Sequence, residues 1–381
     1  MTSKSRRQYL LKIKNRYLES DKLSKQLILD EFCEVCGYNR KHAIRLLNGR
    51  LTRVVKKRGR KSKYSSDEFK QALRRIWEDS GKPCSKTLKS MIPVWLPFYG
   101  VNYENLSKDT HDKLLEVSPS TMDRVLRGTR KKYGRGRGWT KPGSLMRADI
   151  PIRTHFFDET KPGFVEADTV AHCGGSMAGS FIWSLTVTDI NTTWTEVRAV
   201  WNKGAEGVVG GIDDILRILP FKVEGFDCDN GSEFLNHHLV RYCKEKNIYL
   251  TRSRPYRKND NAHVEQKNWT HVRRLLGVDR IDNPDILKDI NELYANQWSL
   301  MQNFFKPSMK LKKKIRVNSR YVKIYHPPKT PYQRILESQC VSSQTKEKLN
   351  KIYNSLDPFK LKKQIDRMTR YVINNRTVAS L

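Results

Sequence analysis

Long apolar runs are missing from this sequence of 381 residues. No stretch approaches the roughly 20 consecutive apolar residues that a membrane-spanning helix needs, and no apolar signal segment follows the basic start Met1–Arg7. These absences predict a cytoplasmic protein without a membrane partner. Hydrophobic residues still make up 38% of the chain and charged residues 30%, as is typical of packed domains.

Cysteine is also sparse. The seven cysteines are odd in number and irregularly spaced, which argues against a disulfide framework and for a reducing compartment. Cys33 and Cys36 have His42 nearby, but no second Cys or His pair follows at zinc-finger spacing. We therefore interpret Cys33 and Cys36 as cysteines buried in a helix rather than as half of a zinc site.

Acidic residues are scarce beside basic ones. The chain has 73 Lys and Arg against 40 Asp and Glu, a net charge of +33. Because the basic residues cluster, we expect a polyanionic partner, of which DNA is the commonest. A solvated basic surface and an RNA partner are the alternatives. A DNA-bound protein of this kind would be associated with the nucleoid.

Residues 1–50 are expected to form an N-terminal helix-turn-helix. Two apolar stripes at helical spacing flank Gly37, formed by Leu27, Ile28, Phe32 and Val35 and then by Ala43, Ile44 and Leu47. Arg40, Lys41 and Arg45 would then face outward toward DNA. An ordinary helical hairpin would give the same pattern.

A basic linker follows at residues 51–63. No acid occurs between Arg50 and Lys63, and Arg58-Gly59-Arg60-Lys61 resembles the core of an arm that enters the minor groove. The alternative is a flexible linker that only neutralises phosphates.

Residues 64–129 are expected to form a second helix-turn-helix unit. Apolar stripes at Phe69, Leu73, Ile76 and Trp77 and at Leu88, Met91 and Ile92 predict helices. Ser118-Pro119 is a typical helix start and Gly128 a typical end. Thr121, Arg124 and Arg127 would point outward toward DNA. A purely structural bundle is the alternative.

A second linker, residues 130–150, is rich in glycine and arginine. Glycine at this density prevents a stable helix, so Arg135 and Arg137 are expected to track DNA into the next domain.

Strand and helix patterns alternate through residues 151–285. Strands are predicted at 164–170, 181–188, 193–200, 222–228 and 248–252, and helices at 205–218, 232–246 and 263–276. The order indicates an α/β domain with a mixed five-stranded sheet, of RNase H-like type. Residues 286–381 form a basic C-terminal region, in which a strand at 321–325 and helices after 331 are expected.

Three carboxylates stand in a fixed order within this domain. Asp168 ends the apolar stretch Phe164–Asp168, Asp229 opens Asp229-Asn230-Gly231-Ser232-Glu233-Phe234, and Glu265 closes Asp260-Asn261-Ala262-His263-Val264-Glu265. The last two acids have 35 residues between them. Hard oxygen ligands held together suit Mg²⁺, and two such ions about 4 Å apart serve phosphodiester chemistry.

This motif set resembles the catalytic core of retroviral integrases and of bacterial insertion-sequence transposases with an Asp-Asp-Glu site. The resemblance covers about residues 160–280. It implies a DNA transposase that binds the terminal inverted repeats of its element, cleaves 3′ ends and transfers strands into target DNA. It further implies two Mg²⁺ or Mn²⁺ ions, with Asp168 on both, Asp229 on one and Glu265 on the other. Double-stranded DNA and a homodimer or larger assembly on it are the partners implied.

Other acids compete for these roles. Glu166 and Asp227 each lie two residues before a proposed ligand and share its strand face, so Asp227 could replace Asp229. We favour Asp229 because Asn230-Gly231 follows it, as in the family. Glu233 is interpreted as a partner of a helix start. Asp260 is a loop acid that could approach the metals.

DNA contacts are expected on both sides of Glu265. Tyr256 could stack on a base, with Arg257 and Lys258 beside it. His263, Lys267 and Asn268 are expected along the Glu265 helix. Asn268 matches a family position next to DNA, whereas Trp269 stands where retroviral integrases often have Lys.

Two other functions fit the same sequence. One is an RNase H-like nuclease that cuts without joining, and the other is a transposase-derived DNA-binding regulator. The paired N-terminal DNA readers argue against the first, and the three intact acids argue against the second.

Overall fold

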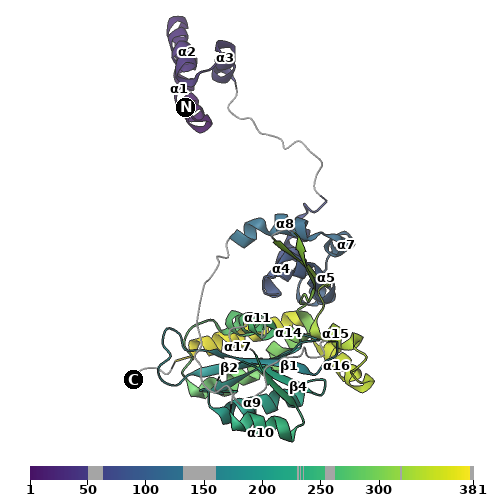
Figure 1. Ribbon diagram of the computed structural model, residues 1–381. Coiled ribbons are helices and arrows are strands. Elements are labelled where there is room, and N and C mark those ends of the chain that lie inside the picture. The colour runs from purple at the N-terminus through teal and green to yellow at the C-terminus, as the bar shows by residue number, and fades with distance from the viewer. Residues whose placement is uncertain are drawn as a thin grey trace. The chain divides into compact units, whose positions relative to one another are not determined.

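The computed structural model describes residues 1–49, 63–131, 160–229, 231, 233–234, 236–253, 262–317 and 320–377. Contacts divide the chain into two compact units, Met1–Ser62 and Lys63–Leu381. Figure 1 shows their helices and strands. No helix in the described ranges is both long and apolar enough to cross a bilayer.

The first unit is a bundle of three helices, α1 (Ser3–Glu19), α2 (Lys22–Cys36) and α3 (Arg40–Asn48). Gly37 ends α2 in the left-handed conformation, at φ 64°, and the Asn39 side chain caps α3. The sequence analysis did not anticipate α1, which contributes Leu10, Ile13 and Tyr17 to the core.

The predicted apolar stripe of α2 is wrong by one position at two places. Leu27 and Val35 are exposed, whereas Leu29 and Cys36 are buried. Three apolar residues in a row at 27 to 29 leave the helix phase open, and the packing of α1 settles it.

The second unit begins with a group of helices. They are α4 (Asp67–Asp79), α5 (Ser85–Trp95), η1 (Leu96–Phe98), α6 (Tyr99–Asn102), α7 (Lys108–Glu116) and α8 (Pro119–Lys131). Both predicted stripes are buried. Gly128 does not end α8, which continues to Lys131. The group packs on the C-terminal helices, where Trp95 Nε1 donates to Phe305 O at 3.3 Å and the Trp95 ring meets Phe359.

A five-stranded sheet follows, as predicted. Its strands are β1 (Phe164–Ala171), β2 (Ile182–Asp189), β3 (Thr195–Trp201), β4 (Gly225–Cys228) and β5 (Tyr249–Arg252). Their order is β3-β2-β1-β4-β5. The β1–β2 and β2–β3 pairs are antiparallel, and β1–β4 and β4–β5 are parallel. This mixed topology confirms the RNase H-like fold.

Helices cover both faces of the sheet. Figure 1 shows α9 (Ala205–Ile218) and α10 (His237–Glu245) on one face, and α11 (Ala262–Lys267) on the other. The helix that starts at α11 continues without a break through a π-helical turn, η2 (Asn268–Arg273), into α12 (Arg274–Leu276). This is the single helix predicted for 263–276, with one altered turn.

The C-terminal region is mixed, as predicted. Its elements are η3 (Pro284–Ile286), α13 (Leu287–Leu293), the π-helical η4 (Tyr294–Trp298), α14 (Ser299–Phe305), β6 (Leu311–Val317), β7 (Arg320–Tyr325), α15 (Pro331–Glu337), α16 (Ser343–Ser355) and α17 (Pro358–Asn374). Helices α13 and α14 pack on β3, and α17 packs on α13. Strands β6 and β7 form a separate two-stranded sheet.

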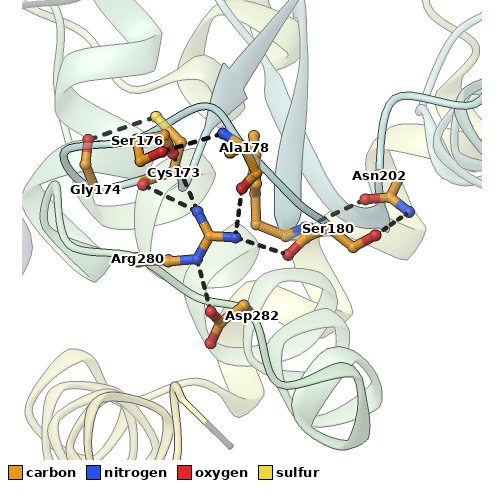
Figure 2. Close-up of polar contacts among 9 residues, drawn as sticks. Cys173, Gly174, Ser176, Ala178, Ser180, Asn202, Arg280 and Asp282 are labelled. Atoms are coloured by element: carbon orange, nitrogen blue, oxygen red, sulfur yellow. Dashed lines mark hydrogen bonds and ion pairs between the residues drawn. The ribbon is translucent and has the colours of Figure 1, made fainter.

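The loop between β1 and β2 is held by one arginine (Figure 2). The Arg280 guanidinium donates to the carbonyl oxygens of Ser176 at 3.0 Å and Ala178 at 2.9 Å, and it bonds Asp282 at 2.6 Å. It also lies over the Phe181 ring. Five donors on a rigid plane suit several carbonyls at once. Arg280 therefore orders the loop that leaves the carboxyl end of β1, the strand on which Asp168 lies.

Candidate active site

The strand register brings Asp168 and Asp229 together. Strands β1 and β4 are parallel, and their last residue pair is Ala167 with Cys228. Continuing this register by one residue places Asp168 beside Asp229. Asp168 lies on the face that the Glu265 helix covers, since Asn268 donates to it, and Asp229 is close enough to raise its pKa.

The two carboxylates repel each other. Burial and the neighbouring Asp229 raise the pKa of Asp168 to about 8. Burial and the neighbouring Glu233 raise the pKa of Asp229. Like charges in a partly desolvated position disfavour ionisation, which a bound cation would reverse. The pair is therefore an electrostatic match for a cation.

Asn268 lies in the site rather than only beside it. Its Nδ2 donates to Oδ2 of Asp168 at 2.6 Å, while its own buried Oδ1 has no hydrogen-bond partner among the described residues. Asn268 is also the first residue of the π-helical turn η2. Turns of this kind often occur at functional sites, because they redirect side chains that a regular helix would place elsewhere.

Glu233 is a site residue that the sequence analysis assigned only to a helix start. Its carboxylate accepts a hydrogen bond from Thr169 Oγ1 at 2.8 Å and pairs with Lys203 Nζ at 2.8 Å, and it is 2% exposed. A β-carbon at position 231 would lie 2.4 Å from Glu233 Oε2, so the glycine of the motif makes room for this carboxylate.

The helix after Glu233 begins later than predicted. Asn236 caps α10 by accepting from the backbone N of Leu239 at 3.0 Å, so the helix starts at His237 rather than at 232. Glu233 thus lies in a turn and reaches the site. The signal that could have revealed this is Asn236 itself, since Asn is a preferred N-cap.

Glu166 connects the sheet to the helix that carries Glu265. Its Oε2 accepts hydrogen bonds from the backbone N of His263 and of Val264, both at 3.1 Å, and its side chain is fully buried. A carboxylate at a helix N-terminus satisfies donors that have no partner within the helix. Glu166 is therefore a positioning residue for α11.

Asp227 is more deeply buried than Asp229. It is fully buried and accepts a hydrogen bond from Thr251 Oγ1 of the neighbouring strand. It belongs to a buried polar row that crosses all five strands, formed in register by Thr195, Thr188, Glu166, Asp227 and Thr251. Asp229 keeps partial exposure beyond the strand end.

Glu265 occupies the first turn of α11 and is exposed to solvent. It lies on the same helix as Asn268, which reaches Asp168. In the described part of the chain, no group of three or more His, Cys, Asp or Glu side chains is arranged to hold a metal ion. The structure thus brings the two aspartates together and leaves the third carboxylate on the adjoining helix face.

The donor chemistry of the site fits a hard divalent cation. Asp168 and Asp229 offer carboxylate oxygens, the ligand type that Mg²⁺ and Mn²⁺ prefer. The unsatisfied Oδ1 of Asn268 adds a buried oxygen beside them. These atoms could hold a metal ion, and Glu265 could complete its ligands from the helix.

Several predicted DNA contacts lie outside the described residues. They are Arg58, Arg60 and Lys61 of the first linker, Arg135 and Arg137 of the second, and Tyr256, Arg257 and Lys258 of the loop before α11.

The predicted contacts on α3 and α8 are exposed, with one exception. Arg40, Lys41 and Arg45 lie on the surface of α3, where Arg40 also pairs with Asp30. On α8, Arg124 and Arg127 are exposed. The half-buried Thr121 accepts a hydrogen bond from Arg124 at 2.9 Å.

The Glu265 helix presents a different surface from the one predicted. Lys267 was expected on an exposed basic face, but it is buried, and its Nζ donates to Thr193 O at 3.4 Å. Burial and the nearby Arg334 lower the pKa of Lys267 to about 7. His263 is half-buried, whereas Trp269 is 50% exposed.

No family model matches the chain. One curated relative is the "Uncharacterized protein y4rM" of Sinorhizobium fredii (strain NBRC 101917 / NGR234). The two are 41% identical over 323 residues, which covers 84% of this chain and 91% of the relative. The chain belongs to the y4rM family. The match is longer than the five-stranded sheet with its covering helices, so it extends beyond that domain.

Solved structures similar to this y4rM-family chain include integrases. The catalytic core of BIV integrase is 17% identical and covers 46% of this chain and 95% of its own, with a TM-score of 0.30. The HTLV-2 integrase core in complex with magnesium is 15% identical and covers 38% of this chain and 89% of its own, with a TM-score of 0.29. A simian T-cell lymphotropic virus intasome in complex with PP2A regulatory subunit B56 gamma is 11% identical. The match covers 58% of this chain and 68% of that one, with a TM-score of 0.31.

Proposed function

We propose that this protein is a DNA transposase that cleaves 3′ ends at the terminal inverted repeats of its element and joins them to target DNA. The observation that carries the proposal is the adjacency of Asp168 and Asp229 at the ends of two neighbouring strands of an RNase H-like sheet. Each lies within a motif that resembles those of integrases and insertion-sequence transposases. A charge of +33 fits a DNA partner.

Each acid has its own task. Asp168, Asp229 and Glu265 would together hold two Mg²⁺ or Mn²⁺ ions, with Asn268 hydrogen-bonded to Asp168. Divalent metal, when bound, activates the attacking oxygen and stabilises the leaving one. Asn268 holds the Asp168 carboxylate in a fixed orientation, and Glu166 holds the N-terminus of the helix that presents Glu265.

The remaining chain would bind and arrange DNA. Helices α3 and α8 present Arg40, Lys41, Arg45, Arg124 and Arg127, which would recognise the element ends together with Thr121. The linker arginines and the loop with Tyr256, Arg257 and Lys258 would track DNA toward the site, with His263 beside it. Two ends must be joined together, so a dimer or larger assembly on DNA follows. A cytoplasmic, nucleoid-associated protein is proposed accordingly.

A strand-transfer assay tests the proposal. Purified full-length protein, Mg²⁺ or Mn²⁺, and labelled duplexes from the regions flanking the gene would be incubated with a supercoiled target plasmid. Cleaved 3′ ends and products joined to the plasmid are expected, with both lost in Glu265→Gln. Cleavage without joining would instead identify a nuclease. Binding without either reaction, in wild type and variant alike, would identify a regulator.

A further inference from the structure

The two-stranded ribbon β6–β7 is the strongest feature that the proposed active site does not use. Six of the fifteen positions in Leu311–Tyr325 are Lys or Arg, and no acid occurs from Phe304 to Leu336. Large apolar side chains on the ribbon are nevertheless exposed, among them Tyr321 at 59%, Val322 at 47% and Tyr325 at 44%. In Figure 1 the ribbon stands apart from the five-stranded sheet.

One face of the ribbon combines basic and aromatic side chains. Arg316 pairs with Tyr321 and Leu311 with Tyr325, and directly opposite residues share a face. Lys323 lies between the two tyrosines at the two-residue strand period, so it shares that face. Arg316, Tyr321, Lys323 and Tyr325 are all exposed. Surfaces that bind nucleic acid combine basic side chains, which contact phosphates, with aromatic rings, which contact sugars and bases.

The base of the ribbon is fixed to the sheet. Ser308 and Lys329 form a bridge below the two strands. Arg334 donates to Ser308 O at 2.5 Å and Oγ at 2.9 Å, and it also donates to Thr192 O at 3.1 Å in the turn between β2 and β3. Lys310 Nζ donates to Asn191 O of the same turn at 2.8 Å. The ribbon therefore has a definite direction relative to the sheet.

The same turn also contacts the Glu265 helix. Lys267, two residues after Glu265, donates to Thr193 O, and Arg334 donates to Thr193 Oγ1 at 2.6 Å. Thr193 thus links the base of the ribbon to the helix of the candidate active site. A polymer bound along the ribbon would be held by an element tied to that helix.

We infer that the β6–β7 ribbon is a DNA-binding arm that grips duplex DNA through the face of Arg316, Tyr321, Lys323 and Tyr325. A two-stranded ribbon fits the major groove, which is about 12 Å wide. The six residues of β7 extend roughly 20 Å, or about six base pairs. The inference rests on the proposed function only for the choice of DNA as the polyanion, and it requires no catalysis.

A salt titration of DNA binding tests the ribbon. Full-length wild type and the double variant Arg316→Ala/Lys323→Ala would bind a labelled 40-base-pair duplex of arbitrary sequence between 50 and 300 mM KCl. Loss of two phosphate contacts should reduce the magnitude of the negative slope of log K against log salt by about 1.8. It should also weaken binding at least about tenfold at low salt. The matched control is Lys348→Ala/Lys351→Ala, which removes two exposed lysines from α16.

A second variant separates aromatic contacts from charge. Tyr321→Thr/Tyr325→Thr keeps the net charge and the preference for a strand. It is expected to weaken binding at least about threefold while leaving the salt slope unchanged. Circular dichroism and sedimentation of each variant should match wild type.

The outcomes distinguish the proposals. If the ribbon variants bind DNA with the same affinity as the α16 control, the inference of a DNA-binding ribbon is overturned. The proposed function is then unaffected. A ribbon variant whose oligomeric state changes while its DNA affinity does not also overturns it, because the ribbon then contacts a second copy. Absence of DNA binding by wild type overturns both. Weakened ribbon variants support the arm even if the strand-transfer assay yields no product.

Discussion

Glu166 accepts a hydrogen bond from the backbone N of Val264, the residue immediately before Glu265. The distance is 3.1 Å, and Glu166 is fully buried on β1, two residues before Asp168. One strand therefore carries both a proposed metal ligand and the anchor of the helix that presents another. The position of Glu265 depends on a carboxylate that itself contacts no substrate.

Removal of this anchor should impair catalysis more than folding. Glu166→Ala leaves the backbone N–H groups of His263 and Val264 without their acceptor, at a cost of about 1 to 3 kcal/mol in unfolding free energy. Displacement of Glu265 should lower the cleavage rate about 100-fold. Glu166→Gln retains one acceptor and should recover part of that rate. Equal cleavage rates for Glu166→Ala and wild type would refute the positioning role.

Asn268 should tune the affinity of the site for metal. Asn268→Ala removes the donor to Asp168 and should raise the Mn²⁺ concentration for half-maximal cleavage roughly 10-fold or more. Gln266→Ala, which removes an exposed amide from the same helix, is the matched control. A Mn²⁺ titration of the cleavage rate measures both, and identical half-maximal concentrations would exclude the orienting role.

Asp168→Asn should stabilise the metal-free protein while abolishing its activity. The substitution removes one of two repelling carboxylates, so the melting temperature in EDTA should rise by roughly 2 °C or more. Addition of Mn²⁺ should stabilise wild type, because a ligand that binds only the folded state raises its stability, and should not stabilise the variant. Calorimetry with and without Mn²⁺ reads both effects. A lower melting temperature in EDTA would show that Asp168 is not under electrostatic strain.

Glu196 should make stability fall as pH rises from 4.5 to about 7. Burial raises the pKa of Glu196 from 4.5 to about 7, although its carboxylate accepts hydrogen bonds from Trp194, Ser299 and Asn303. Between those values the folded state keeps a proton that the unfolded state releases, so folding is favoured below pH 4.5 and loses roughly 3 kcal/mol by pH 8.

Urea unfolding at pH 5 and pH 8 tests this linkage. Relative to wild type, Glu196→Gln should gain about 2 to 3 kcal/mol more at pH 8 than at pH 5, because the amide has no proton to release. Glu347→Gln, an exposed acid on α16, serves as the control. A constant difference between Glu196→Gln and wild type at both pH values would contradict the assignment.

The sequence predicts the sheet well because its signals are local and redundant. Alternating side chains identify the strands, and the Asp-Asn-Gly motif after β4 identifies the strand end at which Asp229 lies. Strand register then follows from parallel pairing, which is how Asp168 and Asp229 become neighbours. The strands can be identified without knowledge of distant packing, whereas the pairing of β1 with β4 comes from the structure.

What the sequence did not predict depends on tertiary contacts. Lys267 was predicted to face outward because charged residues usually do, yet it is buried and donates to the carbonyl oxygen of Thr193. Glu233 was assigned to a helix that starts only at His237. The π-helical turn that begins at Asn268 has no periodicity of its own in the sequence. The burial of Lys267 is decided by a distant partner, whereas the start of α10 is decided by the local cap Asn236.

The most direct test of the account is the cleavage rate of three single variants with Mn²⁺ on labelled duplexes from the gene's flanks. Asp168→Asn, Asp229→Asn and Glu265→Gln should each lose on the order of 1000-fold or more, and the double variant Asp168→Asn/Glu265→Gln should lose little beyond either single one, as for groups that act as a unit. Glu245→Gln, an exposed acid on α10, should cleave like wild type. Cleavage by Glu265→Gln within about tenfold of wild type would contradict a three-carboxylate site.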